Sequence, residues 1–139
     1  MLLNRFALLL AAAGTLAMAQ DAPANPAQIE RGRYLAEEVG KCQMCHSPLA
    51  ETGGYDKERW MKGAVMNLAP IKPVEGWHKT SPDITPSGRL WERWGEAGLV
   101  KYMVTGLNPR GGTADAPMPT YKLKQEDAEA LVAYLKSLK

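Results

Sequence analysis

Apolar side chains recur at helical spacing most clearly near the C-terminus. The pattern i, i+3, i+4, i+7 is filled by Ala128, Leu131, Val132, Leu135 and Leu138. Glu126 and Asp127 come just before this stripe, where the dipole of a helix favours acidic side chains. The pattern therefore predicts a last helix with one buried face.

Two further segments carry a weaker helical period. Residues 28–39 place Ile29, Tyr34, Leu35 and Val39 roughly on one side, with Asn25 and Pro26 suited to a cap and first turn and Gly40 to a stop. Residues 93–105 place Leu99, Tyr102 and Met103 on one face before Gly106, although Gly95 and Gly98 blur where this helix starts. We expect an all-α fold, since no segment has the alternation of a strand.

Residues 47–90 lack both the helical and the strand period. They contain several glycines and five prolines: Pro48, Pro70, Pro73, Pro82 and Pro86. So long an irregular segment is uncommon in a small domain unless it wraps around something. We expect it to enclose a non-protein core.

The N-terminus has the pattern of a secretory signal peptide. One cationic residue, Arg5, precedes an apolar run, and Ala17-Met18-Ala19 forms a small-x-small cleavage site. The run is shorter than the roughly 20 residues that cross a bilayer. We expect a signal peptide over 1–19, a flexible Ala/Pro-rich leader over 20–27 and one domain over 28–139, with no transmembrane anchor after cleavage and a soluble periplasmic product.

Charge gives no reason to expect a nucleic-acid partner. Lys and Arg number 17 against 15 Asp and Glu, a formal net charge of +2, and acidic and basic residues are interspersed. Cleavage before Gln20 removes only Arg5 from this balance. An electrostatic partner preference would have to come from a local patch.

The only two cysteines lie in the sequence Cys42-Gln43-Met44-Cys45-His46. A redox dithiol usually sits in a scaffold with strands, and none is expected here. A zinc site would need His78 as a fourth ligand from a proline-rich loop. A disulfide between Cys42 and Cys45 would close too small a loop to add much stability. The remaining interpretation is covalent attachment of one c-type haem.

Haem attachment needs these residue types in this order. Each thiol adds to one haem vinyl group, and the adjacent His46 is delivered beneath the ring to bind iron. Attachment takes place outside the bacterial inner membrane, so the predicted export agrees with it. The cofactor would also supply much of the core that a chain of this size lacks.

The second axial position of the iron decides between electron transfer, which a strong sixth ligand favours, and binding of small molecules. The candidate side chains are Met61, Met66, Met103, Met118 and His78. Met103 shares the apolar face of the middle helix, and His78 is expected to be solvated or locally bonded. Met118 is flanked by Pro117 and Pro119, which favour a rigid extended strap. Packing of Met118 on the core is the alternative.

With these motifs, the chain resembles the bacterial class I, single-haem cytochromes c. The resemblance covers "RGRYLAEEVGKCQMCHS" and "APMPTYKLKQEDAEALVAYLKSL". It implies an all-α fold in which the first helix, near Gly32, crosses the last near Tyr134, with the haem in a cleft wrapped by the irregular loop. It also implies His46 as the proximal and Met118 as the distal iron ligand.

The middle of the chain departs from the compact members of that family. A proline carbonyl often orients the proximal imidazole there, and Pro48, Pro70 and Pro73 are all candidates. The segment formed by residues 59–84 is longer than the corresponding segment of the compact members. Its Trp60, Trp77 and Asn67 could cover the haem edge or bond its propionates, although simple packing is the commoner role for tryptophan.

The functional expectation is a periplasmic electron carrier that is not itself an enzyme and that has donor and acceptor redox proteins as partners. A haem-bearing, electron-accepting subunit of a periplasmic dehydrogenase is the alternative, with the same ligands. A gas-binding haem protein would require that Met118 not bind iron, and such helix bundles place the attachment motif near the C-terminus.

Overall fold

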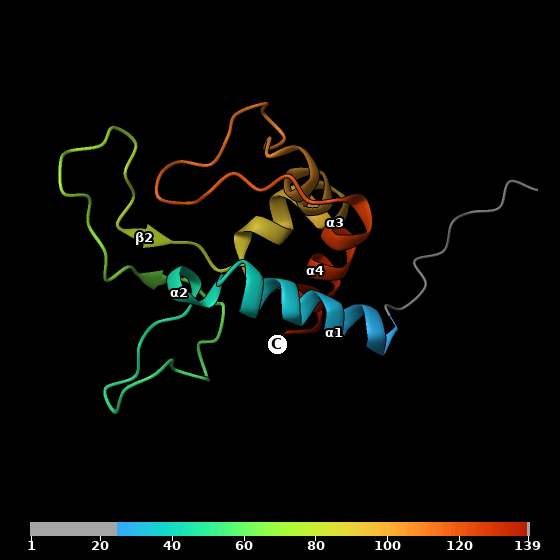
Figure 1. Ribbon diagram of the computed structural model, residues 1–139, viewed down its shortest axis with the longest axis horizontal. Coiled ribbons are helices and arrows are strands. Elements are labelled where there is room, and N and C mark those ends of the chain that lie inside the picture. The colour runs from blue at the N-terminus through green and yellow to red at the C-terminus, as the bar shows by residue number, and fades with distance from the viewer. Residues whose placement is uncertain (1–24, 139) are drawn as a thin grey trace, which may run out of the picture.

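Helices open and close the part of the chain that the computed structural model describes, residues 25–138, and irregular segments fill its middle (Figure 1). The elements in order are α1 (Pro26–Tyr34), the π-helix η1 (Leu35–Val39), α2 (Gln43–His46), β1 (Ala64–Val65), β2 (Thr80–Ser81), α3 (Arg89–Thr105) and α4 (Gln125–Ser137). The expected helical class is confirmed. The predicted signal peptide and most of the leader lie outside the described residues.

The first helix begins two residues before the expected domain boundary at 28. Asn25 is its N-cap, and its side chain accepts a hydrogen bond from the Gln28 amide at 2.8 Å. Pro26 follows in the first turn, where the missing N–H costs nothing. The helix then widens into η1, where the Gly40 amide donates to the Leu35 carbonyl at 2.8 Å, and ends at Gly40 as predicted.

The first and last helices cross in close contact at Gly32. A Cβ built on this glycine would lie 1.9 Å from the carbonyl oxygen of Ala130 and 2.7 Å from the Cβ of Tyr134. Only glycine allows the two backbones to approach so closely. The crossing near Gly32 and Tyr134 is thus confirmed, and it packs α1 against α4 as Figure 1 shows.

The core lies between η1, α3 and α4. Its buried apolar residues are Leu35, Ala36, Met61, Leu99, Tyr102, Met103, Ala128, Ala130, Leu131, Val132, Tyr134 and Leu135. The stripe expected on the last helix is buried up to Leu135, and the Met103 packing expected on the middle helix is also found. The helices α1, α3 and α4 lie together on one side of the molecule, while α2, the strands and the loops next to them lie on the other (Figure 1).

The middle helix starts at Arg89, four residues before the predicted position. It is interrupted at Gly95, whose backbone angles of φ 62° and ψ 177° are accessible only to glycine. Gly106 ends it in the left-handed conformation, with its amide bonded to the Tyr102 carbonyl at 2.7 Å. The uncertain start of this helix in the sequence therefore corresponds to the interruption at Gly95. The predicted end at Gly106 is confirmed.

The irregular middle segment folds back on itself through one short antiparallel pair. Ala64 pairs with Ser81 and Val65 with Thr80, so the residues between them form a loop that projects from the body (Figure 1, yellow-green). These two-residue strands are too short to leave a sequence period. Among residues 25–138, no helix has the length and apolar character needed to span a bilayer.

Candidate haem attachment site

Cys42 and Cys45 stand one turn apart at the start of the short helix α2. The Cys42 carbonyl accepts hydrogen bonds from the amides of Cys45, at 3.2 Å, and His46, at 2.9 Å. Lys41 enters the turn with a positive φ of 51°. Both thiols are unoxidised and half-buried. The helical turn therefore delivers the two sulfurs and the imidazole as one rigid group.

Burial keeps both cysteines in the neutral thiol form. It raises the pKa of the Cys42 thiol to about 11 and also raises the pKa of Cys45. Reactive redox dithiols need the opposite shift. Within residues 25–138, no cluster of three or more His, Cys, Asp or Glu side chains is arranged to hold a metal ion. The redox-dithiol and zinc interpretations of the motif thus lack support in this part of the chain.

His46 is held by a bond from a segment far along the chain. Its side chain is buried, and Nδ1 lies 2.8 Å from the carbonyl oxygen of Pro82. Since a carbonyl only accepts, the proton must sit on Nδ1, which leaves Nε2 with a lone pair for a metal. Burial lowers the pKa of His46, opposed by the Pro82 carbonyl and the Asp83 charge. A neutral imidazole of fixed tautomer is what iron requires.

The proline that orients His46 is none of the three candidates from the sequence. The sequence indicates Pro48, Pro70 and Pro73 as candidates, whereas Pro82 supplies the carbonyl. It does so because β2 pairs with β1 and brings residue 82 back beside α2, 36 positions from the histidine.

Further bonds fix the backbone of the attachment turn. The Ser81 hydroxyl donates to the Cys45 carbonyl, and the Gly63 amide donates to the His46 carbonyl at 2.8 Å. A Cβ on Gly63 would come within 2.7 Å of the Ser81 carbonyl. The Ser47 hydroxyl accepts from the Met61 amide at 2.9 Å. The strand pair and its neighbouring residues thus hold the backbone of the attachment turn in place.

The methionine candidates separate by environment. Met61 is fully buried in the helical core at 0% exposure, with a positive φ of 59°, so it is a packing residue. Met103 is buried on α3. Met66 follows β1, half-buried, with its amide bonded to Lys79. Met118 is half-buried in the segment between α3 and α4, and its amide donates to the Asp115 carbonyl at 3.1 Å, closing a turn where an extended strap was expected.

The strap that carries Met118, residues 115–123, is tied to the attachment segment. The Tyr121 hydroxyl donates to the Gly40 carbonyl at 3.0 Å, and a Cβ on Gly40 would lie 3.3 Å from the Cys42 Sγ. The Leu123 amide donates to the Met103 carbonyl at 2.9 Å. Burial raises the pKa of Tyr121 to about 12. No local pattern indicated this tyrosine, because its bond joins segments 81 positions apart.

Two buried polar atoms of the described residues have no protein partner: the indole Nε1 of Trp77 and the Oε1 of Gln43. A buried donor without an acceptor is costly, so such atoms often mark where a bound group supplies the partner. A haem carries propionate carboxylates that accept hydrogen bonds. Together with two neutral thiols and a neutral imidazole whose Nε2 can bind iron, the Trp77 donor fits a covalently bound haem.

The other residues singled out from the sequence have different roles. His78 Nε2 lies 3.1 Å from the Asp115 carboxylate, so this exposed histidine is locally bonded as expected. Asn67 is exposed. Trp60 donates to the Tyr134 hydroxyl at 3.1 Å and packs edge-on against Tyr55, with ring centroids 5.7 Å apart. It is a packing residue, the commoner of the two roles considered.

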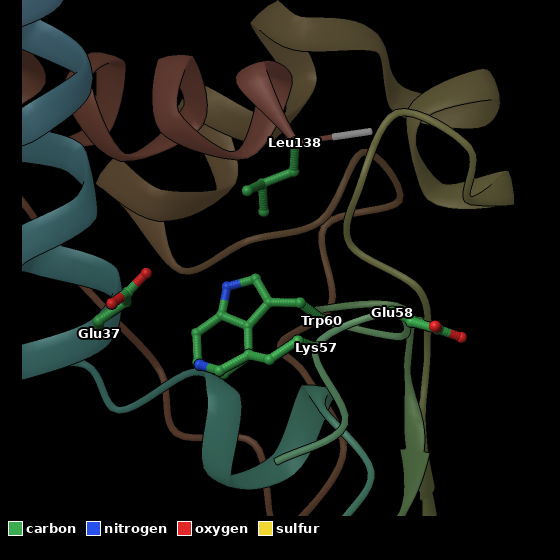
Figure 2. A pocket seen from close by; sticks show the side chains of 5 residues that line it. All are labelled: Glu37, Lys57, Glu58, Trp60 and Leu138. Carbon is green, nitrogen blue, oxygen red and sulfur yellow. The ribbon is translucent and has the colours of Figure 1, made fainter.

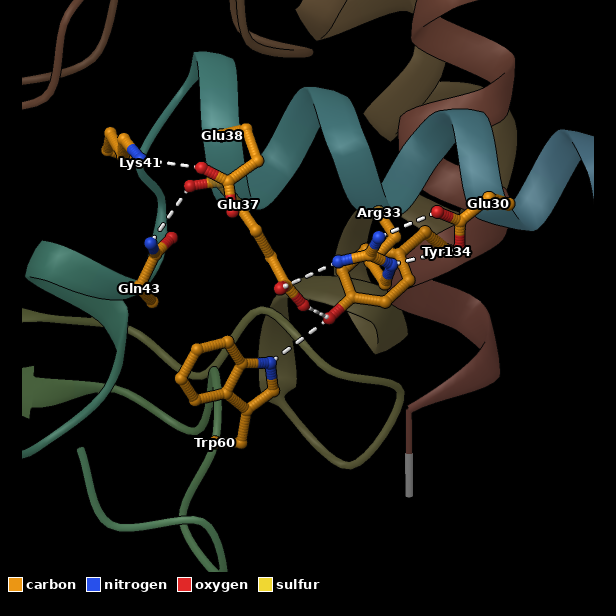
Figure 3. A network of polar contacts seen from close by, with 8 residues as sticks. All are labelled: Glu30, Arg33, Glu37, Glu38, Lys41, Gln43, Trp60 and Tyr134. Carbon is orange, nitrogen blue, oxygen red and sulfur yellow. Dashed lines mark hydrogen bonds and ion pairs between the residues drawn. The ribbon is translucent and has the colours of Figure 1, made fainter. Parts of the chain in front are cut away.

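Trp60 belongs to a polar network that joins it to Tyr134 of α4 and, through Tyr134, to Glu37 of η1 (Figure 3). Tyr134 donates to Glu37, and Arg33 lies 3.4 Å from the other oxygen of that carboxylate. Trp60 also lines an open pocket of about 360 Å³ with Glu37, Lys57, Glu58 and Leu138 (Figure 2). The Lys57 ammonium lies 4.0 Å from the centre of the Trp60 ring. This pocket is lined, as far as the chain is described, by no cysteine, histidine or methionine.

The site therefore contains, in one Cys-x-x-Cys-His turn, the residue types that covalent haem attachment requires. The chain belongs to the cytochrome c family, which it matches over residues 29–139. Members of this family carry covalently bound haem c and transfer electrons. The architecture is that of the class I fold.

Similar proteins include a diheme cytochrome c-type protein of Cereibacter sphaeroides, 36% identical over 112 residues, which are 77% of this chain and 34% of that protein. A nicotinate dehydrogenase subunit of Pseudomonas putida is 33% identical over 86% of this chain and 10% of its own length. The gluconate 2-dehydrogenase cytochrome c subunit of Pantoea cypripedii is 32% identical over 79% of this chain and 26% of its own length. The chain spans about a third of these relatives or less.

Proposed function

We propose that the chain is an exported, periplasmic electron carrier in which Cys42 and Cys45 form the haem thioethers and His46 and Met118 are the axial ligands. A bound haem supplies an iron that alternates between ferrous and ferric states. The observation that carries this proposal is the buried, neutral His46 held by Pro82 at 2.8 Å directly beside the two thiols.

The protein's own residues favour fast transfer by holding their positions. Pro82, Ser81 and Gly63 fix the histidine side of the site, and Tyr121 and Leu123 tie down the strap of Met118. A ligand pair that stays bound in both oxidation states requires little rearrangement on transfer. The methionine thioether also raises the reduction potential, because it favours the ferrous state.

The test of the ligand assignment is Met118→Ala in haem-loaded protein. We expect loss of the weak near-infrared sulfur-to-iron band of the ferric protein, binding of carbon monoxide by the ferrous protein and a lower potential. Met66→Ala is the matched control, since Met66 is half-buried like Met118 whereas Met61 is a core residue. Retention of the band in Met118→Ala would reject the assignment. Absence of the band and ready carbon monoxide binding in the unmutated protein would favour a gas-binding function.

The test of export is deletion of residues 2–19. Without the signal peptide the chain should remain in the cytoplasm and accumulate without haem, and intact mass distinguishes the two forms. The full-length chain should begin at Gln20 after processing. Haem on the leaderless chain would contradict the proposed compartment.

A second candidate function is that of a haem subunit in a periplasmic dehydrogenase. Two of the relatives described above carry dehydrogenase names, which favours this alternative. Size-exclusion chromatography of a native periplasmic extract separates the two. A free carrier elutes near the mass of the single chain, while a subunit elutes with a dehydrogenase activity that reduces its haem.

A further inference from the structure

The turn that opens the Met118 strap is contacted by a segment of the projecting loop, residues 76–78. The backbone amide of His78 donates to the Ala116 carbonyl at 2.8 Å. The His78 ring also faces Asp115, with Nε2 3.1 Å from Oδ2. Gly76 lies against the same carboxylate, since a Cβ built there would be 3.9 Å from Asp115 Oδ1. This part of the loop therefore borders one end of the strap.

The contacted residues are those that set the position of Met118. The Asp115 carbonyl accepts the Met118 amide at 3.1 Å, so Asp115 and Met118 are the two ends of one turn. A shift of Asp115 or Ala116 is passed through this turn to the methionine. At the other end of the strap, Tyr121 and Leu123 are anchored to Gly40 and Met103. Without the His78 contacts, the strap would be held mainly at that end.

We propose that His78 is a positioning residue for the axial methionine and that it acts through Asp115. The inference rests on the proposed role of Met118 as the iron ligand. In the bond, Nε2–H of the imidazole donates to the carboxylate, which can only accept. His78 thereby restrains the strap in the arrangement that keeps the thioether on iron and competing ligands off it.

The exposure of the pair predicts a local effect. The side chains of His78 and Asp115 are 60% and 69% exposed, and exposed pairs add little to global stability. Local opening of a loop, however, depends on few contacts and responds to the loss of one of them. A ligand that binds only to the opened form has an apparent affinity proportional to the opened fraction. Loss of the contact should thus appear in ligand exchange and not in unfolding.

The experiment is a titration of haem-loaded ferric protein with imidazole at constant pH. Imidazole must displace the thioether, so loss of the sulfur-to-iron band follows its binding. His78→Ala and Asp115→Ala should each bind imidazole about two- to fivefold more tightly, the effect expected of one exposed pair. The double variant should bind little more tightly than either single variant, because the two side chains act through one contact. His78→Gln keeps an N–H donor and should stay near the unmutated value.

Glu30→Ala is the matched control, since it removes the exposed partner of Arg33 at 2.6 Å on α1. Its imidazole affinity should equal that of the unmutated protein, and the melting temperature of the His78 variants should not change. Unaltered imidazole affinity in both single variants would overturn the proposal, as would additive effects in the double variant. Failure of the ligand assignment is distinguished separately, because the band would then persist in Met118→Ala whatever the His78 variants do.

Discussion

The hydroxyl of Tyr121 and the carbonyl of Gly40 join the strap of Met118 to the segment that carries Cys42, through a hydrogen bond of 3.0 Å. The bond crosses 81 positions of sequence. It connects the strap that carries one proposed iron ligand to the segment that delivers the other. Removal of this bond should therefore lower the stability of the protein and loosen the strap that carries Met118.

Tyr121→Phe removes this hydroxyl without altering the ring. We expect the haem-loaded protein to lose about 1 kcal/mol in free energy of unfolding, because the Gly40 carbonyl is left without its partner. Urea denaturation followed by far-ultraviolet circular dichroism measures the change. Tyr34→Phe, at an exposed position, is the control. Equal stability of the Tyr121 variant and the unmutated protein would show that the bond contributes nothing.

The same tyrosine predicts alkaline sensitivity. Burial raises the pKa of Tyr121 from its ordinary 10.0 to about 12, and burial also raises the pKa of Tyr102. The tyrosine therefore ionises in the unfolded chain before it does so in the folded protein. As the pH rises above 10, this ionisation stabilises the unfolded state relative to the folded state. We expect the free energy of unfolding to be fully retained below pH 10 and to fall between pH 10 and 12. In Tyr121→Phe this fall should be shallower, as stability measured across that range would show.

Gly32→Ala should disrupt the helix crossing. The added Cβ would lie 1.9 Å from the Ala130 carbonyl oxygen, a backbone atom that cannot turn aside. Separation of α1 from α4 should cost about 3 kcal/mol, at the upper end for overpacking. Gly98→Ala is the control. Its Cβ would lie 3.1 Å from the side-chain Cβ of Trp94, a much milder contact than the one at Gly32. Chemical denaturation of both variants gives the comparison, and similar losses would contradict the role given to Gly32.

Trp77→Phe tests whether the bound haem supplies an acceptor to the indole N–H. If it does, the haem-loaded variant should lose about 1 to 2 kcal/mol. Trp91→Phe serves as the reference for the loss of one indole hydrogen bond, because Trp91 donates to the Ile84 carbonyl at 2.7 Å. If the Trp77 donor stays unpaired in the loaded protein, its removal should instead be neutral or stabilising, and thermal unfolding would then show no loss.

The sequence was sufficient for those features that short segments determine. The last helix, the stops at Gly40 and Gly106 and the attachment turn all follow from residues close together in the chain. The support of His46 could not be found in this way, because two-residue strands bring Pro82 into place and leave no period. From the sequence alone, Met61 and Met66 are equally good ligand candidates. Only the tertiary fold shows that Met61 is buried in the core. The Trp60–Tyr134 contact, 74 positions apart, likewise had no local signal.

On the proposed export, which starts at the N-terminus, the order of the elements along the chain also fixes the order in which they reach the periplasm. Cys42 and Cys45 arrive early, whereas Pro82, Tyr121 and α4 follow later. The residues that bury the thiols and hold the imidazole thus reach the attachment turn only after it exists. A haem-attaching enzyme therefore meets the cysteines most openly before α4 closes against α1, and premature closure would leave the chain folded around unmodified thiols.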